Sequence, residues 1–219
     1  MNEISTPDAR NVSRRRRGQA QREGLALLAG IVGLMWFVEV INAIDSYHLD
    51  SDGIYARNLA RLWGIFTAPF IHANFAPHLL DNTIPLVFMG AIIALHGARR
   101  LALVTLIVIV IGGLGTWLVS PAHVSTIGAS GLVFGYATYL LARGFFDRSP
   151  LELLTGLIVG VIWGGALLSS IVPQTGISWQ GHLAGAVAGV IAAYVLRRER
   201  PAAGQRSRGT RTPAGALAE

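Results

Sequence analysis

The stretch LALVTLIVIVIGGLGTWLVS, residues 101–120, contains no charged side chain. An α-helix needs about 20 mostly apolar residues to cross the hydrocarbon core of a bilayer, and this stretch has that length. Five further apolar stretches lie along the chain, at residues 24–44, 78–97, 127–143, 151–172 and 181–197. The chain is therefore predicted to be an all-α membrane protein, with six transmembrane helices in one domain at residues 24–198.

The composition of the whole chain supports the membrane class. Of its 219 residues, 52% are hydrophobic and only 14% are charged, whereas a soluble domain carries about 25% charged residues. The chain has no cysteine, which excludes disulfides, zinc sites made of thiolates and a cysteine nucleophile.

The distribution of basic residues predicts the orientation. All 18 are arginines, and all but Arg57 and Arg61 lie in or beside the terminal tails, residues 1–23 and 199–219, or at two short turns. Because cytoplasmic segments are enriched in Lys and Arg, both termini are predicted to be cytoplasmic, and an even number of spans satisfies this. Both tails are polar and are predicted to be disordered. Their arginines favour contact with anionic lipid over binding of nucleic acid.

Candidate site residues lie at the start of the second, fourth and sixth predicted helices. The polar ones are His78 and Asn82, then Ser130, and finally His182, and Gly128 and Phe134 accompany Ser130 on the fourth. Even-numbered spans start on the outer side, so the three groups share one depth in the membrane. Polar side chains inside spans are unfavourable and are therefore functional candidates. A serine, an imidazole and an amide at one depth indicate an acyl-transfer site.

The chemistry gives each of these residues a role. Ser130 is the candidate nucleophile and His182 the candidate base that takes its proton. Glycines spaced four apart on the fourth and sixth helices favour the close approach that would bring the two side chains together. The backbone amide of Ser130 and the side chains of Asn82 and His78 are candidate donors to an oxyanion. Phe134 lies one turn below Ser130, where its ring could stack on His182.

Each feature alone also fits a structural role. A Gly-x-Ser-Gly sequence is a weak signal in a glycine-rich membrane protein, and a histidine at a helix end is often only interfacial. His78 and Asn82 could cap a helix beside Pro77. Glu39, the one carboxylate well inside an apolar stretch, is interpreted as interfacial or structural. The conjunction of the three groups at one depth favours catalysis.

Together these motifs resemble those of the rhomboid family over residues 25–197. The matching residues are Gly128-Ala129-Ser130-Gly131, Gly181-His182-x-x-Gly185-x-x-x-Gly189 and His78-x-x-x-Asn82. Residues 62–72 also look like the end of the first loop of that family, and residues 177–180 resemble the segment before the histidine in bacterial members.

The resemblance implies an intramembrane serine protease with a Ser-His dyad. Such an enzyme cleaves transmembrane helices of membrane-protein substrates near the extracytoplasmic side. The fifth helix and the cap loop after it would form a lateral gate. The resemblance further implies a multi-pass protein of a bacterial inner (plasma) membrane. Its partners would be transmembrane substrates and lipid, with no nucleic acid, metal or organic cofactor. It leaves the oligomeric state open.

Four positions depart from the family pattern. Gly64 follows Trp63 where Arg is frequent, and Pro77 lengthens the interval between His72 and His78. Phe134 stands where Tyr is frequent, and Asp81 stands where an uncharged residue is usual. The main alternative is a catalytically inactive rhomboid-like protein that binds transmembrane helices. A small transporter is disfavoured because the third and fifth helices lack charged residues through their middles.

Overall fold

Each of the six apolar stretches is helical in the computed structural model, which describes residues 9–197. The elements are α1 (Ala9–Ile44), β1 (Ile54–Tyr55), α2 (Gly64–Thr67), α3 (Leu80–Ala94), α4 (Ala98–Ile107), α5 (Gly113–Val119), β2 (Ser125–Thr126), α6 (Ser130–Asp147), α7 (Pro150–Ser169) and α8 (Trp179–Val195). A π-helical turn at Val108–Gly112 joins α4 to α5 in one continuous helix, and another at Phe75–Leu79 precedes α3.

Four helical segments of the described chain are long and apolar enough to cross a membrane. They are Arg10–Ile44, Phe75–Ala94, Ala98–Val119 and Pro150–Ser169. Large hydrophobic side chains are exposed along them, among them Phe37, Ile84 and Val161, as expected for surfaces that face lipid. The all-α membrane class is therefore confirmed. The helices α6 and α8 have 18 and 17 residues and contain several glycines, so their assignment as the remaining two spans stays a prediction.

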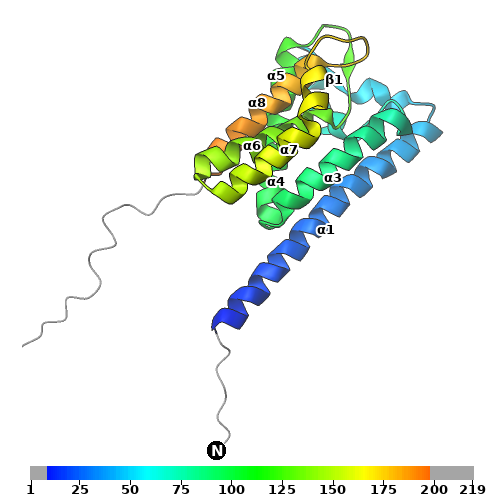
Figure 1. The fold of residues 1–219 in the computed structure, drawn as a ribbon. Coiled ribbons are helices and arrows are strands. Elements are labelled where there is room, and N and C mark those ends of the chain that lie inside the picture. Colours follow the sequence, from blue (N-terminus) through cyan, green and yellow to red (C-terminus); the bar gives the residue numbers. More distant parts are fainter. Residues whose placement is uncertain (1–8, 198–219) are drawn as a thin grey trace, which may run out of the picture.

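The helix α1 begins at Ala9 rather than near residue 24, so the prediction of disorder is wrong for residues 9–23. Arg, Gln, Ala and Glu are good helix formers, and a segment that extends an existing helix avoids the unfavourable nucleation step. With 36 residues, α1 is about 54 Å long, and its N-terminal part extends beyond the other helices (Figure 1). Residues 1–8 and the predicted C-terminal tail lie outside the described residues.

The helix α6 lies at the centre of the helix bundle, in contact with α3, α7 and α8. Its side chains Tyr136, Tyr139 and Leu140 are buried in the main hydrophobic core. On one side of the molecule, α1 packs against α3 and α4 (Figure 1). The residue at which α6 begins, Ser130, is thus fixed by a helix that is surrounded by others.

Arg143 belongs to the last turns of α6 rather than to the turn that follows, and its side chain is only 2% exposed. It forms ion pairs with Glu152 of α7 at 2.9 Å and with Asp147 at 3.3 Å. Arg143 therefore ties α6 to α7. The distribution of arginines along the sequence, which predicts the orientation, does not reveal this structural role.

The loop between α1 and α3 is tied to the segment before α6. The strands β1 and β2 pair antiparallel, with Ile54 opposite Thr126 and Tyr55 opposite Ser125. In the same loop, a methyl group at Gly64 would collide with the carbonyl oxygen of Gly53. This close approach explains why glycine follows Trp63, where a larger residue is frequent in the family that the motifs resemble.

Candidate active site

Ser130 is the first residue of α6. Gly128, with φ of +110°, turns the chain into the helix, and two hydrogen bonds hold this turn. The amide of Gly128 donates to the carbonyl of Ala68 at 2.8 Å, and the amide of Ala129 donates to Nε2 of His72 at 3.2 Å. The first amides of a helix have no partner within it, so the N–H groups of Ser130, Gly131 and Leu132 form the positive end of the helix dipole beside the nucleophile candidate.

His182 lies in the first turn of α8 and is 6% exposed. Its Nδ1 atom is 2.8 Å from the carbonyl oxygen of Ser170. Because a carbonyl oxygen only accepts, Nδ1 carries the proton in this contact, which leaves Nε2 of a neutral ring free to accept one. The ring stacks on Phe134 of α6, with centroids 4.3 Å apart and planes 10° apart. The stacking contact expected from the sequence is therefore present.

The helices α6 and α8 approach each other along glycines. A methyl group at Gly185 would collide with the carbonyl oxygen of Gly131, and one at Gly189 with that of Gly135. Beside this contact, Oγ1 of Thr138 donates to the carbonyl oxygen of Ala186 at 2.7 Å. The predicted close packing of the fourth and sixth helices is thus confirmed.

One cavity of about 590 Å³, here called the site cavity, lies between the start of α3, α6, α7 and the loop before α8. All six residues singled out in the sequence line it: His78, Asn82, Gly128, Ser130, Phe134 and His182. No hydrogen bond joins Ser130 to His182 within residues 9–197. Hydrogen bonds between catalytic groups are often long in a free enzyme and shorten when substrate binds.

The two candidate oxyanion donors on the α3 side differ in their settings. Nδ2 of Asn82 donates to the carbonyl of His78 at 2.9 Å, and this nitrogen is 4.0 Å from the position that a Cβ atom at Gly128 would take. The amide nitrogen thus faces the turn that precedes Ser130. His78 is exposed, and its Nδ1 lies 2.9 Å from Oδ1 of Asn74.

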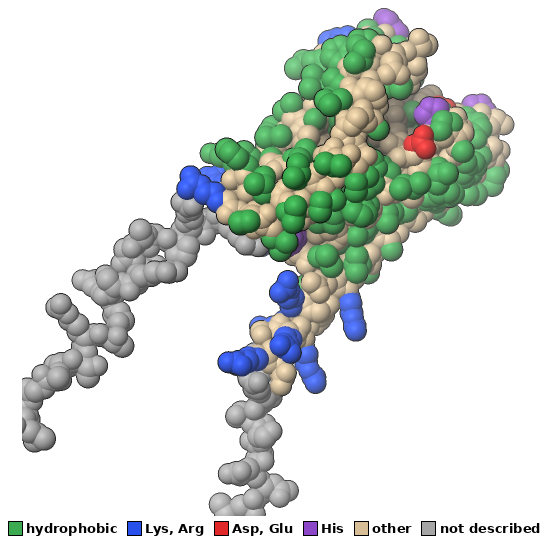
Figure 2. Space-filling model, viewed as in Figure 1, with side chains coloured by type: hydrophobic (Ala, Val, Ile, Leu, Met, Phe, Trp, Pro, Cys, Tyr) green, Lys and Arg blue, Asp and Glu red, His purple; other side chains and the backbone are tan. Residues whose placement is uncertain are grey.

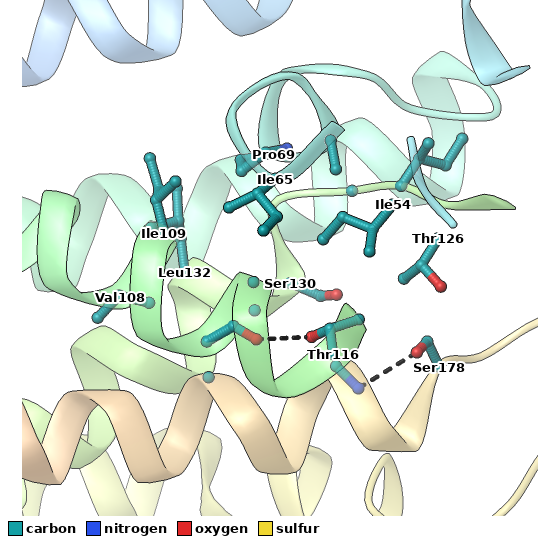
Figure 3. A pocket seen from close by; sticks show the side chains of 18 residues that line it. Ile54, Ile65, Pro69, Val108, Ile109, Thr116, Thr126, Ser130, Leu132 and Ser178 are labelled. Atoms are coloured by element: carbon teal, nitrogen blue, oxygen red, sulfur yellow. Dashed lines mark hydrogen bonds between the residues drawn. The ribbon is translucent and has the colours of Figure 1, made fainter. Parts of the chain in front are cut away.

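A second, smaller cavity of about 50 Å³ lies on another side of Ser130. Figure 3 shows it between Ile65, Ile109 and Leu132, with Thr116 and Ser178 nearby. Since a water molecule occupies about 30 Å³ in the liquid, this space is large enough to hold water beside the serine.

Sequence reasoning missed the role of His72, which is 1% exposed and accepts the hydrogen bond from Ala129 described above. Asn42, at the end of α1, holds the other side of this residue, because its Nδ2 donates to the carbonyl of His72 at 3.1 Å. His72 therefore links α1 to the residue before Ser130. The pattern offered one signal, a histidine in the loop that resembles the rhomboid first loop, but it could not indicate the partner.

Burial lowers the pKa of His72 from its ordinary value of 6.5 to about 4. The ring stays neutral in the folded protein at pH values where the unfolded chain is protonated. The stability that His72 contributes is therefore complete above about pH 6.5 and is lost as the pH falls toward 4. We expect His72→Gln to flatten this part of the dependence of Tm on pH, measured in detergent. His48→Gln, at an exposed loop position, is the control, and an unchanged profile in His72→Gln would contradict the assignment.

Comparison with known proteins agrees with these observations. The Rhomboid domain matches residues 59–199. An uncharacterized protein of Mycobacterium tuberculosis is 44% identical over 75% of this chain and 72% of its own length. The candidate rhomboid protease YdcA of Bacillus subtilis is 29% identical over 63% of this chain and 70% of its own. Rhomboid-like protein 11, chloroplastic, of Arabidopsis thaliana is 31% identical over 65% and 55%, respectively. Together with the helix arrangement and the motifs, these matches show that the chain is an integral membrane protein that belongs to the rhomboid family.

Proposed function

We propose that this protein is an intramembrane serine endopeptidase that cleaves transmembrane helices near their extracytoplasmic ends, with Ser130 as nucleophile and His182 as base. The observation that carries the proposal is the setting of His182. Its ring is stacked on Phe134, its Nδ1 is bound to the carbonyl of Ser170, and it faces the same cavity as Ser130. Packing and a carbonyl would thus orient the imidazole, as a carboxylate does in a triad.

In the proposed reaction, Oγ of Ser130 attacks the carbonyl carbon of the scissile bond and its proton passes to Nε2 of His182. The amide of Ser130 and the side chains of Asn82 and His78 stabilise the oxyanion. The C–N bond then breaks, and His182 protonates the leaving amine. A water molecule, deprotonated by His182, attacks the acyl-enzyme, which releases the new carboxyl terminus and restores Ser130.

The proposed orientation puts both termini in the cytoplasm and the site cavity near the outer surface. In Figure 2, arginines gather on the protruding part of α1 and at the end of the bundle closest to that protruding part. Hydrophobic side chains cover the flanks of the bundle. The start of α1 and the starts of α3, α6 and α8 lie at opposite ends by the order of the helices. This arrangement supports the positive-inside assignment.

The proposed entry route lies between α3 and α7. Phe88 of α3 and Trp163 of α7 pack with ring centroids 4.9 Å apart, and Trp163 also lines the site cavity. Movement of α7 together with the loop that follows it would separate these rings. A substrate helix could then reach Ser130 from the lipid.

Labelling with a fluorophosphonate probe tests the proposed function directly. We expect the purified protein in detergent to react at Ser130, because His182 activates that hydroxyl, and Ser130→Ala to remain unlabelled. Mass spectrometry of the labelled peptide locates the adduct. Ser170 and Ser178 line the same cavity, so they are internal controls. Labelling at either of them instead would contradict Ser130 as the nucleophile, and an unlabelled but folded wild type would favour an inactive helix-binding relative.

A further inference from the structure

Asp81 is the one formally charged residue among those that line the site cavity. The other lining side chains are apolar, neutral polar or histidine. Asp81 is exposed, and within residues 9–197 no ion pair or hydrogen bond engages its carboxylate. The cavity therefore has a single fixed negative charge that no cation of the described chain neutralises.

Stabilisation by the helix dipole does not explain why a carboxylate lies at position 81. A carboxylate in the first turn of a helix is stabilised by free amides, and Asp81 is the second residue of α3. The π-helical turn before α3, however, already supplies acceptors for these amides. Leu79 donates to the carbonyl of Asn74 and Leu80 to that of Phe75, while the side chain of Asn74 accepts from the amide of His78. The free end of the helix thus lies at Asn74, well before Asp81.

The placement of Asp81 puts its charge beside the reaction. It directly precedes Asn82, the candidate oxyanion donor. His78 lies three residues before it and Pro85 four residues after it, spacings that share one helix face, and both line the site cavity. A cation on a substrate that entered between α3 and α7 would meet Asp81 at the mouth of the cavity.

We infer that Asp81 makes the enzyme selective for substrates that carry Lys or Arg within a few residues of the scissile bond. The inference rests on the proposed protease function and names its substrate class. The class is narrow, because basic residues are depleted at the outer ends of transmembrane helices. A preference for a cation there would separate the substrates from most other membrane proteins.

A panel of single-span substrates tests this inference. Each member carries Lys, Gln or Glu at one of the four positions on either side of the scissile bond. For the wild type we expect kcat/KM to be about twofold to fivefold higher with Lys than with Gln at one or two adjacent positions, and this ratio to shrink in high salt. Asp81→Asn should bring the ratio to about one, and Asp81→Lys should favour Glu-bearing substrates at the same positions.

Asp45→Asn is the matched control, because Asp45 lies in the same outer region but does not line the site cavity, and its ratio should equal that of the wild type. Probe labelling of Ser130 in each variant verifies that the site is intact. Equal rates for Lys and Gln at every position, or an Asp81→Asn variant that keeps the preference, would overturn the inference and leave the protease function standing. If Ser130 is labelled but the panel is not cleaved, protection of Ser130 from the probe by each substrate gives the same comparison. Failure of both labelling and cleavage would overturn the proposed function and the inference with it.

Discussion

Replacing Ser130 with Ala is expected to lower cleavage of a single-span substrate by roughly 10⁴-fold or more, and His182→Ala to do the same. Either change removes one half of the nucleophile–base pair, so the acyl-enzyme no longer forms. The structure places both side chains on one cavity and orients the ring of His182 from two sides. The measurement is the rate of appearance of the cleaved fragment, with purified protein and substrate reconstituted in liposomes.

Two further variants make this result specific. Ser169→Ala removes an exposed hydroxyl that bonds to the carbonyl of Ala166 and lies outside the site cavity, so we expect wild-type activity. The double variant of Ser130 and His182 should be no slower than either single variant, because residues that act as a unit are not additive. Full activity in folded Ser130→Ala protein would show that this serine is not the nucleophile.

Gly185→Ala is expected to lower stability by about 1–3 kcal/mol, as overpacking of a tight interface does. The added methyl group would meet the backbone carbonyl of Gly131, which cannot rotate away as a side chain can. The two helices must separate, and since Ser130 and His182 lie on opposite sides of this contact, we expect cleavage to fall by about 10²-fold. Thermal unfolding in detergent and the liposome assay measure the two effects.

The control is Gly164→Ala in α7, where no atom lies within 4 Å of the added methyl group. Alanine is the better helix former by up to about 1 kcal/mol, so this variant should equal the wild type in stability or exceed it. Equal stability and activity of the variants at Gly185 and Gly164 would contradict the tight contact between α6 and α8.

The sequence allowed the helices and the gathering of the site residues to be predicted for one physical reason. Hydrocarbon requires long apolar helices, and the order of the spans then fixes which ends share a depth. The stacking of Phe134 on His182 followed from helical spacing plus the glycines that bring α6 and α8 together. These inferences need only periodicity and the thickness of a bilayer.

What the sequence could not supply depends on contacts between distant segments. The hydrogen bond from Ala129 to His72 and that from Asn42 to His72 join three segments of the chain, and no local pattern encodes them. The burial of Arg143 depends on Glu152 of the next helix. The helical extension of α1 has a polar composition, which by itself indicates disorder, although its residues favour a helix once the apolar part nucleates it.

The backbone contacts at Gly185 and Gly189 also predict how the gene tolerates random change. Any base substitution at the first or second position of a glycine codon encodes a bulkier amino acid or a stop. At Gly185 and Gly189 every such amino-acid substitution therefore inserts atoms where a carbonyl oxygen already lies. A Cβ atom at Gly164 or Gly165 would instead lie in open space. A mutational library read by sequencing after selection should retain Ala and Val at the second pair and lose them at the first, while charged residues are lost at all four positions because α7 lies in the membrane.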